Sequence, residues 1–424
     1  MNRNATQTET IEVKTIRVAE GRARTCRFLI VLGLLISSGN AVGQNPDSKF
    51  DQATVFEEVS NAVSEKFWDA EFGGTDWQST SDCWREKAIL ATTHDEFAQA
   101  INGMLSTLKT SHTRYFPVTD PRHFQLLGVF EFVAPDSKPE LFTYDGIGID
   151  TRTIDGKIFV SAVFDGLPAD GAGLRFGDEI VSVDSAPFHP INSFRGKAAK
   201  GVEVSVRRTN NGPLQPFKVS VTALNGRTMF DDAMENSARV IENGGKKIGY
   251  VHIWSYAGIK YHERLQELVL FGKLAACDSL IVDFRDGWGG ASLDYVNLFR
   301  EPLVAVESNS RTREPASYTG VWGKPVLLLI NSGSTSGKEL YAFAFRKHKL
   351  GTIVGEKSAG AVVAGQCIPL VNGDVLYLAV SDLRIDGQRL EGAGVEPDIA
   401  VERPIPYAND ADPQLDKAVE LLAK

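Results

Sequence analysis

The segment that decides the fold of this chain is VLLLINSGSTSGKELYAFA, residues 326–344. Its five apolar residues 326–330 predict a buried strand, the Ser- and Gly-rich residues 331–337 predict a turn, and a helix is predicted to start near Glu339. A serine at such a junction is held out of the sheet beside the N–H groups of a helix N-terminus, which stabilise an oxyanion. The same residue types also suit an ordinary helix cap. The candidate nucleophiles of this turn are Ser336, Ser332 and Ser334.

From residue 231 to 424, short apolar runs alternate with helical patterns. Strands are predicted at 248–253, 279–284, 326–330 and 351–355, and helices at 265–271, 339–345 and 415–422. This alternation predicts an α/β core with parallel strand pairing. The glycine turn RDGWGG, residues 285–290, follows the second strand, and its free N–H groups could donate to an oxyanion or to a substrate backbone.

Residues 44–125 form a separate helical region. Apolar residues at three- and four-residue spacings predict amphipathic helices between about residues 50 and 110. The segment LKTSHT, residues 108–113, follows directly and contains His112 between two hydroxyl residues. A serine nucleophile needs a base. His112 is therefore the candidate among seven histidines, although a loop histidine can also be structural.

Residues 126–230 are predicted to form a connector, irregular from 120 to 142, followed by a β-domain. Short strands are predicted at 146–149, 157–163, 177–183 and 202–206, with a helical turn at 168–174. The run GIGI at 146–149 and the segment LPADGAGLRFGDEIVSVD at 167–184 resemble a PDZ domain. Such a module holds a peptide's terminal carboxylate on the N–H groups of a glycine-rich turn and takes the peptide as an added strand. The resemblance implies Ile147, Gly148 and Ile149 for that contact; the alternative is a β-domain whose glycines only form turns.

Residues 1–43 have the order of a secretory signal. Three arginines precede the apolar run FLIVLGLLI, residues 28–36, and small residues follow it. The run is shorter than the roughly 20 residues of a membrane-spanning helix. We expect cleavage near Ala41 or Gly43 and an exported protein, periplasmic or secreted, without stable membrane insertion after cleavage. Retention of the segment as a membrane anchor and a buried N-terminal strand are the alternatives.

Composition excludes several other functions. The 424 residues carry a net charge of −9, and residues 44–424 hold 39 basic and 51 acidic side chains, a net charge of −12. No basic cluster suits nucleic acid. Beyond the signal the cysteines are Cys83, Cys277 and Cys367, an odd number without a CxxC pair, so we expect no disulfide and no zinc site. The chain has no HExxH or paired His-x-His pattern, and we expect no metal and no other cofactor.

The ordered motifs together resemble C-terminal processing peptidases and the tricorn protease core. They are LKTSHT, the PDZ-like segment, IVDFRDGWGG (281–290), LLLINSGSTSGKELYAFA (327–344), GTIVGEKSAG (351–360) and LEGAGVEPDIAV (390–401). The resemblance extends from about Phe56 to the C-terminus. It implies a multidomain α+β fold: a helical N-terminal segment, an inserted PDZ-like β-domain and an α/β (ClpP/crotonase-like) catalytic core.

The resemblance also distinguishes two branches of the family. In the Ser-Lys branch a lysine follows shortly after VGE, but this chain has Ala361 at that position. Lys357 lies four positions early, and Lys338 is two residues from Ser336, on another side of a helix. A Ser-Lys dyad is therefore disfavoured, and the chain is similar to the tricorn-like branch.

In that branch a serine, a histidine, a second serine and a glutamate act together. The resemblance implies Ser336 as the nucleophile and His112 as the general base and then acid. Ser111 and Glu391 would orient and polarise the imidazole, with the nearby Glu396 and Asp398 as the other acidic residues. The resemblance also implies an oxyanion hole of Gly337 and Gly289, with Gly290 beside them.

We therefore expect an exported serine endopeptidase that acts on polypeptides bound by their C-termini through the PDZ-like domain. The sequence favours no oligomeric state. A catalytically silent peptide- or lipid-binding scaffold and a serine esterase are the alternatives. If the pKa of His112 is near its ordinary ~6.5, activity should rise between about pH 6 and 7.

Overall fold

The computed structural model describes residues 50–130, 139–302, 304–312 and 314–424. The expected signal, residues 1–43, lies outside the described residues. Within the described ranges, no helix has both the length and the apolar character needed to cross a lipid bilayer.

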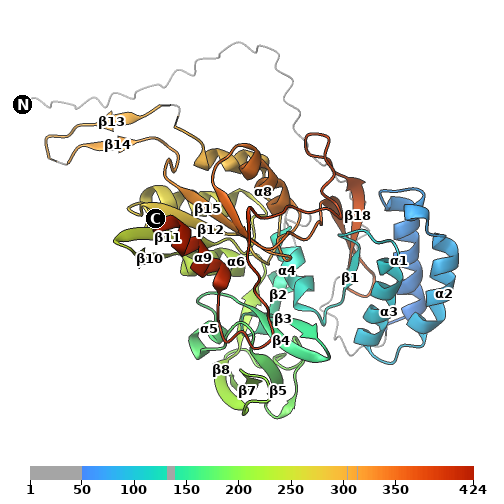
Figure 1. Ribbon diagram of the computed structural model, residues 1–424. Helices are drawn as coiled ribbons and strands as arrows, with labels where there is room; N and C mark the ends of the chain where they lie inside the picture. Colours follow the sequence, from blue (N-terminus) through green and yellow to red (C-terminus); the bar gives the residue numbers. More distant parts are fainter. Residues whose placement is uncertain (1–49, 131–138, 303, 313) are drawn as a thin grey trace, which may run out of the picture. The chain divides into compact units, whose positions relative to one another are not determined.

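A six-stranded sheet forms the centre of the C-terminal region (Figure 1). Its order is β10 (Arg239–Asn243), β11 (Lys246–His252), β12 (Ser279–Asp283), β15 (Val326–Ile330), β16 (Thr352–Gly355) and β19 (Ile399–Ala400). The strands from β11 to β19 pair in parallel, and β10 is antiparallel. Strands buried on both faces are continuous apolar runs. This explains why every residue of β15, the predicted strand 326–330, is buried.

Helices cover both faces of this sheet, which confirms the predicted α/β core. Tyr341 and Phe345 of α8 (Gly337–Lys347) and Leu265 of α7 (Ile259–Gln266) pack into the apolar cluster of one face. Ala418 and Val419 of α9 (Pro413–Leu422) belong to the cluster on the other face. Ser336 lies in the short turn between β15 and α8, at the carboxyl end of this central strand.

The N-terminal helices are α1 (Gln52–Lys66), α2 (Trp77–Ile89) and α3 (His94–Ser106). Side chains of Asp51, Asp76 and Thr93 cap them by accepting helix N–H groups. The helices share an apolar cluster with β17 (Val363–Pro369) and β18 (Val375–Asp382). Strand β1 (Arg114–Phe116) pairs antiparallel with β18. This pairing fixes the segment that carries His112 against the C-terminal region.

Residues Pro121–Val129 form helix α4, so the prediction of an irregular connector from 120 to 142 was wrong for this stretch; residues 131–138 lie outside the described residues. Proline fits the first turn of a helix because it has no N–H that would need a partner there. The side chain of Asp120 accepts the backbone N–H of Arg122 at 2.9 Å and caps the helix. Pro121 therefore starts a helix.

The β-domain has its own sheet and its own apolar cluster. The sheet order is β3 (Ile149–Ile154), β4 (Lys157–Val163), β5 (Glu179–Val183), β7 (Gly201–Arg207) and β8 (Gln215–Ser220), with β6 (Ala186–Pro187) paired to β5. The short helix α5 (Pro168–Ala172) lies at the predicted helical turn.

The predicted strand 146–149 is divided in the structure. Strand β2 (Thr143–Gly146) ends at its first residue and pairs with β9 (Thr222–Asn225), and β3 begins at its last residue, Ile149. Between them Gly148 has a φ of +84°, and a Cβ there would lie 2.4 Å from the Cβ of Leu167. Glycine is therefore required at a turn, not in a strand.

The remaining described elements complete the chain. They are η1 (Phe72–Gly74), η3 (Pro139–Phe142), α6 (Met229–Ser237), the π-helical turn η4 (Glu267–Phe271), η5 (Leu293–Phe299) and the hairpin of β13 (Val306–Ser308) and β14 (Ala316–Tyr318).

Candidate active site

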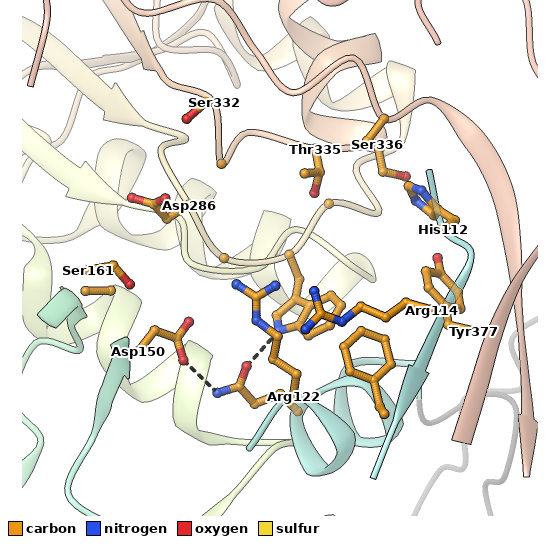
Figure 2. A pocket seen from close by; sticks show the side chains of 18 of the residues that line it. His112, Arg114, Arg122, Asp150, Ser161, Asp286, Ser332, Thr335, Ser336 and Tyr377 are labelled. Carbon is orange, nitrogen blue, oxygen red and sulfur yellow. Dashed lines mark hydrogen bonds between the residues drawn. The ribbon is translucent and has the colours of Figure 1, made fainter. Parts of the chain in front are cut away.

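Ser336 occupies a strained position between β15 and α8. Its φ is 58° and its ψ is −124°, a region that residues other than glycine rarely adopt. Such strain clusters at functional sites, and a sharp strand-to-helix turn presents a serine hydroxyl at the end of a sheet. The Ser336 N–H donates to the carbonyl of Ala361 at 2.9 Å. Figure 2 shows the Ser336 hydroxyl pointing toward the imidazole of His112.

Glu339 holds this turn in place, and the sequence analysis missed its role. The fully buried carboxylate accepts the N–H groups of Ser336 (3.1 Å), Gly360 (2.7 Å) and Ala361 (2.8 Å) and the hydroxyl of Ser358 (2.6 Å). Burial raises the pKa of Glu339, while these donors lower it. The Ser-x-x-Glu spacing from Ser336 to Glu339 is a helix-capping signal that could have revealed it.

A hydrogen-bonded chain connects His112 to Glu391. The Ser111 hydroxyl lies 3.0 Å from His112 Nδ1 and donates to Glu391 Oε2 at 2.8 Å. The N–H groups of Ser111 (2.8 Å) and Val362 (2.7 Å) donate to the same carboxylate. A hydroxyl has one proton to donate. The Ser111 hydroxyl uses its hydrogen in the bond to Glu391, so it can only accept a hydrogen bond from His112. Nδ1 therefore carries the imidazole hydrogen, and Nε2 is left as an acceptor.

The environment of His112 changes the pH at which it titrates. Burial lowers the pKa of His112 to about 4, although the charge of Glu391 raises it. The expectation of a pKa near 6.5, and of activity rising between pH 6 and 7, therefore needs correction. His112 is neutral, and able to accept a proton, from about pH 5 upward.

The other candidate nucleophiles are placed differently. The Ser334 hydroxyl is buried, donates to the carbonyl of Phe284 at 3.0 Å and accepts the Asn331 N–H at 3.0 Å. Ser332 lies apart from His112 in Figure 2. Of the candidates, the structure brings Ser336 to the imidazole.

The alternative acids and bases also lie away from the Ser336–His112 pair. Glu396 forms an exposed ion pair with Lys357 at 2.9 Å, and Asp398 accepts the N–H of Ile353 at 2.7 Å. Lys338 is fully buried and donates through Nζ to the carbonyl of Asp286 at 2.7 Å. Burial lowers the pKa of Lys338 to about 7.

The glycine turn 287–290 packs directly on the nucleophile turn. A Cβ on Gly289 would lie 2.7 Å from Ser336 Cβ, and a Cβ on Gly337 would lie 2.3 Å from the nitrogen of Ala291. Only glycine permits these approaches. For the described residues, the structure gives the N–H groups of Gly289, Gly290 and Gly337 no backbone acceptor. The predicted oxyanion residues are therefore together, beside Ser336.

The predicted peptide-binding residues line a groove of about 920 Å³. The side chains of Ile147 and Ile149 are buried in the core of the β-domain. The backbone carbonyls of Ile147 and Gly148 already accept hydrogen bonds, from the N–H groups of Ala169 and Phe164 respectively. A ligand there would meet backbone N–H groups and the free edge of β3, which ends its sheet.

Three domain types match segments of this chain. Residues 247–401 match peptidase family S41, residues 50–106 the tricorn protease C1 domain and residues 146–221 the PDZ domain. These matches confirm the predicted resemblance. The chain thus combines a segment similar to peptidase family S41, residues 247–401, with a segment similar to the PDZ domain.

Two relatives and one solved structure illustrate the likeness. The chain is 25% identical over 323 residues to the carboxy-terminal processing protease CtpB of Bacillus subtilis, covering 72% of this chain and 62% of that protein. It is 25% identical over 390 residues to tricorn protease homolog 1 of Streptomyces coelicolor, covering 90% of this chain and 36% of that protein. The chain thus spans less than two thirds of either relative. The crystal structure of the tricorn protease has the same fold, with a TM-score of 0.52 at 19% identity over 88% of this chain and 36% of that one.

Proposed function

We propose that this protein is a serine endopeptidase that cleaves polypeptides through an acyl-enzyme on Ser336. His112 Nε2 takes the hydroxyl proton as Ser336 attacks the peptide carbonyl, and then gives it to the leaving amine. Ser111 and Glu391 hold the tautomer that this step needs and stabilise the imidazolium that forms. The observation that carries the proposal is the chain Glu391–Ser111–His112 beside the strained Ser336.

The oxyanion of the tetrahedral intermediate would lie against the N–H groups of Gly337 and Gly289, with Gly290 beside them. Support comes from their contact with Ser336 and from the absence of backbone acceptors for these N–H groups in the described part of the chain. A donor in such a position contributes about 3 kcal/mol at the transition state. Water activated by His112 then hydrolyses the acyl-enzyme.

The PDZ domain would bind the substrate by its C-terminus. The N–H groups at Ile147, Gly148 and Ile149 would hold the terminal carboxylate, while the edge of β3 takes the peptide as an added strand. The positive φ of Gly148 and the edge position of β3 support this assignment. From the signal-like order of residues 28–43 we also propose export to the periplasm or the medium.

The test is labelling of the purified protein with a fluorophosphonate, with the modified residue mapped by mass spectrometry. We expect label on Ser336, and loss of label in Ser336→Ala and His112→Ala. Ser332→Ala is the matched control and should keep the label. Label on another serine, or none on the folded protein, would contradict the proposal. Parallel assays with peptide and ester substrates separate a peptidase from an esterase.

A further inference from the structure

A cavity of about 260 Å³ adjoins Ser336 and His112. Its wall joins the catalytic turns to the PDZ domain, since β1 contributes Arg114, α4 contributes Arg122, and β3 contributes Asp150 and Arg152. Figure 2 shows the guanidinium groups of Arg114 and Arg122 side by side in the middle of the cavity.

These arginines form no ion pair within the described residues, although the charge of Asp120 acts on Arg114 and that of Asp150 on Arg122. Across the described residues, no hydrogen bond or ion pair involves the side chain of Arg114, Arg122 or Arg152, and Arg114 contacts the ring of Phe116, 5.4 Å from its centroid. The side chains of Arg114, Arg122 and Arg152 are exposed. By contrast, Arg207 and Arg208 of the same PDZ domain are paired with Glu179 and Asp178.

The two acidic residues of the cavity are engaged elsewhere. Asp150 accepts the Gln125 amide at 3.3 Å; burial raises the pKa of Asp150, while the charge of Arg122 and this hydrogen bond lower it. Asp286 accepts the Asn331 amide at 3.1 Å. Neither carboxylate forms an ion pair with an arginine within the described residues. Three arginines and two carboxylates line the cavity, so its lining has an excess of one positive charge.

The cavity continues into the PDZ groove. The lining of the groove that contains Ile147–Ile149 includes Arg114, Arg122, Asp150 and Arg152, which also line the cavity. A peptide with its C-terminus in the groove must pass these side chains before its scissile bond reaches Ser336. The arginines therefore face the part of the substrate on the C-terminal side of the cleaved bond.

We propose that Arg114, Arg122 and Arg152 form a subsite for a carboxylate on the C-terminal side of the cleaved bond, which gives the enzyme a preference for acidic substrates there. The inference rests on the proposed function, because it needs a peptide bound between the PDZ groove and Ser336. A guanidinium group recognises a carboxylate through paired, charge-assisted hydrogen bonds. The carboxylate comes from an Asp or Glu side chain, because the substrate's own C-terminus lies in the PDZ groove.

The experiment compares matched, internally quenched peptides built on one sequence, chosen by profiling cleavage of a proteome-derived peptide mixture. A single Glu or Gln is placed at each position after the cleaved bond in turn, and every peptide keeps a free C-terminus for the PDZ groove. A charge-assisted hydrogen bond is worth about a ten-fold ratio or more. We expect kcat/KM to be at least about ten-fold higher for the carboxylate-bearing member of one pair.

Variants then assign the preference to the arginines. In the double variant Arg114→Gln/Arg122→Gln, kcat/KM should be equal for the Glu and Gln peptides. In Arg122→Glu, the preference should change to peptides with Lys at that position. Arg85→Gln is the matched control, because Arg85 is 47% exposed, pairs with Glu57 and does not line the cavity. Equal kcat/KM for every Glu–Gln pair in the wild type would overturn the inference. A ratio that survives in the double variant would overturn it as well.

Fluorophosphonate labelling of Ser336 separates this inference from the proposed function. Labelled variants without the acidic preference show that the catalytic residues are intact and that the subsite alone is lost. If the wild type takes no label, the proposed function fails, and the subsite is tested by fluorescence anisotropy of the same peptides on Ser336→Ala. Tighter binding of the carboxylate-bearing peptide by about ten-fold then supports the arginine subsite, and equal binding overturns it.

Discussion

Replacing Lys338 with methionine should make the protein more stable. Lys338 is fully buried on α8, and its Nζ donates to the carbonyls of Asp286 (2.7 Å) and Trp254 (3.5 Å). No carboxylate of the described residues forms an ion pair with it. Burial lowers the pKa of Lys338 from 10.5 to about 7, although Asp283 and Asp286 raise it. The folded protein therefore holds a poorly compensated cation near neutral pH.

The size of the effect follows from the difference in proton binding. Between pH 7 and 10.5 the unfolded chain keeps the Lys338 proton and the folded chain loses it, so the free energy of unfolding rises with pH. This proton linkage costs the folded state about 4 kcal/mol at pH 7 and about 2 kcal/mol at pH 9. The lost hydrogen bonds offset about 1 kcal/mol of the gain. Lys338→Met should thus be more stable by about 3 kcal/mol at pH 7.

The assay is urea unfolding of the wild type and Lys338→Met at pH 7, 8 and 9. The stability difference should shrink by about 2 kcal/mol from pH 7 to pH 9. Lys357→Met is the matched control, because Lys357 is 51% exposed and pairs with Glu396, and it should change stability by less than about 0.5 kcal/mol. If Lys338→Met is less stable than the wild type by the same amount at every pH, the reasoning about a buried charge is refuted.

The same substitution should slow labelling of Ser336. Lys338 is a donor to the Asp286 carbonyl, and Asp286 begins the turn that contains Gly289 and Gly290. Without this donor the turn is less firmly held over the serine. A gain in stability with a loss of activity is the trade-off expected of a residue retained for function.

Three further results are expected. The rate of Ser336 labelling should be level from pH 8 to about pH 5 and fall about ten-fold per pH unit below about pH 4, because protonated His112 is no base; a midpoint near pH 6.5 would contradict the burial of the ring. Gly289→Ala should slow labelling by about a hundred-fold, since its Cβ would lie 2.5 Å from the Thr335 carbonyl, whereas Gly201→Ala, with open space at its Cβ, should label normally. Gln125→Leu removes the acceptor of the Trp288 indole N–H (3.1 Å) and should lower the free energy of unfolding by about 1–3 kcal/mol in urea; unchanged stability would mean that this bond contributes nothing.

Much of the core could be predicted because its strands are dictated locally. The run 326–330 is apolar throughout and bounded by a proline and a polar turn, and the structure has β15 at those residues. Strand β4 likewise coincides with the predicted strand 157–163. Prediction failed at residues whose type occurs in two different local structures. Pro121 starts a helix or breaks one depending on its cap, and Gly148 serves a turn inside an apolar run.

The residues of the candidate site could be predicted from short motifs, but the burial and electrostatic surroundings of these residues could not. His112 and Ser336 stand in segments that sequence can single out. The low pKa of His112 depends on burial by segments that are distant in sequence, including β18, whose Tyr377 ring lies 5.1 Å from the imidazole. That Arg114 and Arg122 line the same cavity likewise depends on how β1 and α4 pack. No local pattern carries such information.

The positive φ angles around the cavity show how the site is held. Ser336 (58°), His112 (54°) and Asp286 (53°) are all non-glycine residues in the left-handed region, each at a cost of about 1 kcal/mol or more. Hydrogen bonds fix two of them, since Ser336 N binds the Ala361 carbonyl and Asp286 N binds the Asn331 side chain at 3.1 Å. The third, His112, lies directly before β1, which pairs with β18. Each strained residue is therefore constrained from a different segment, so the catalytic geometry depends on the complete fold and should be lost when the segment after β16 is removed.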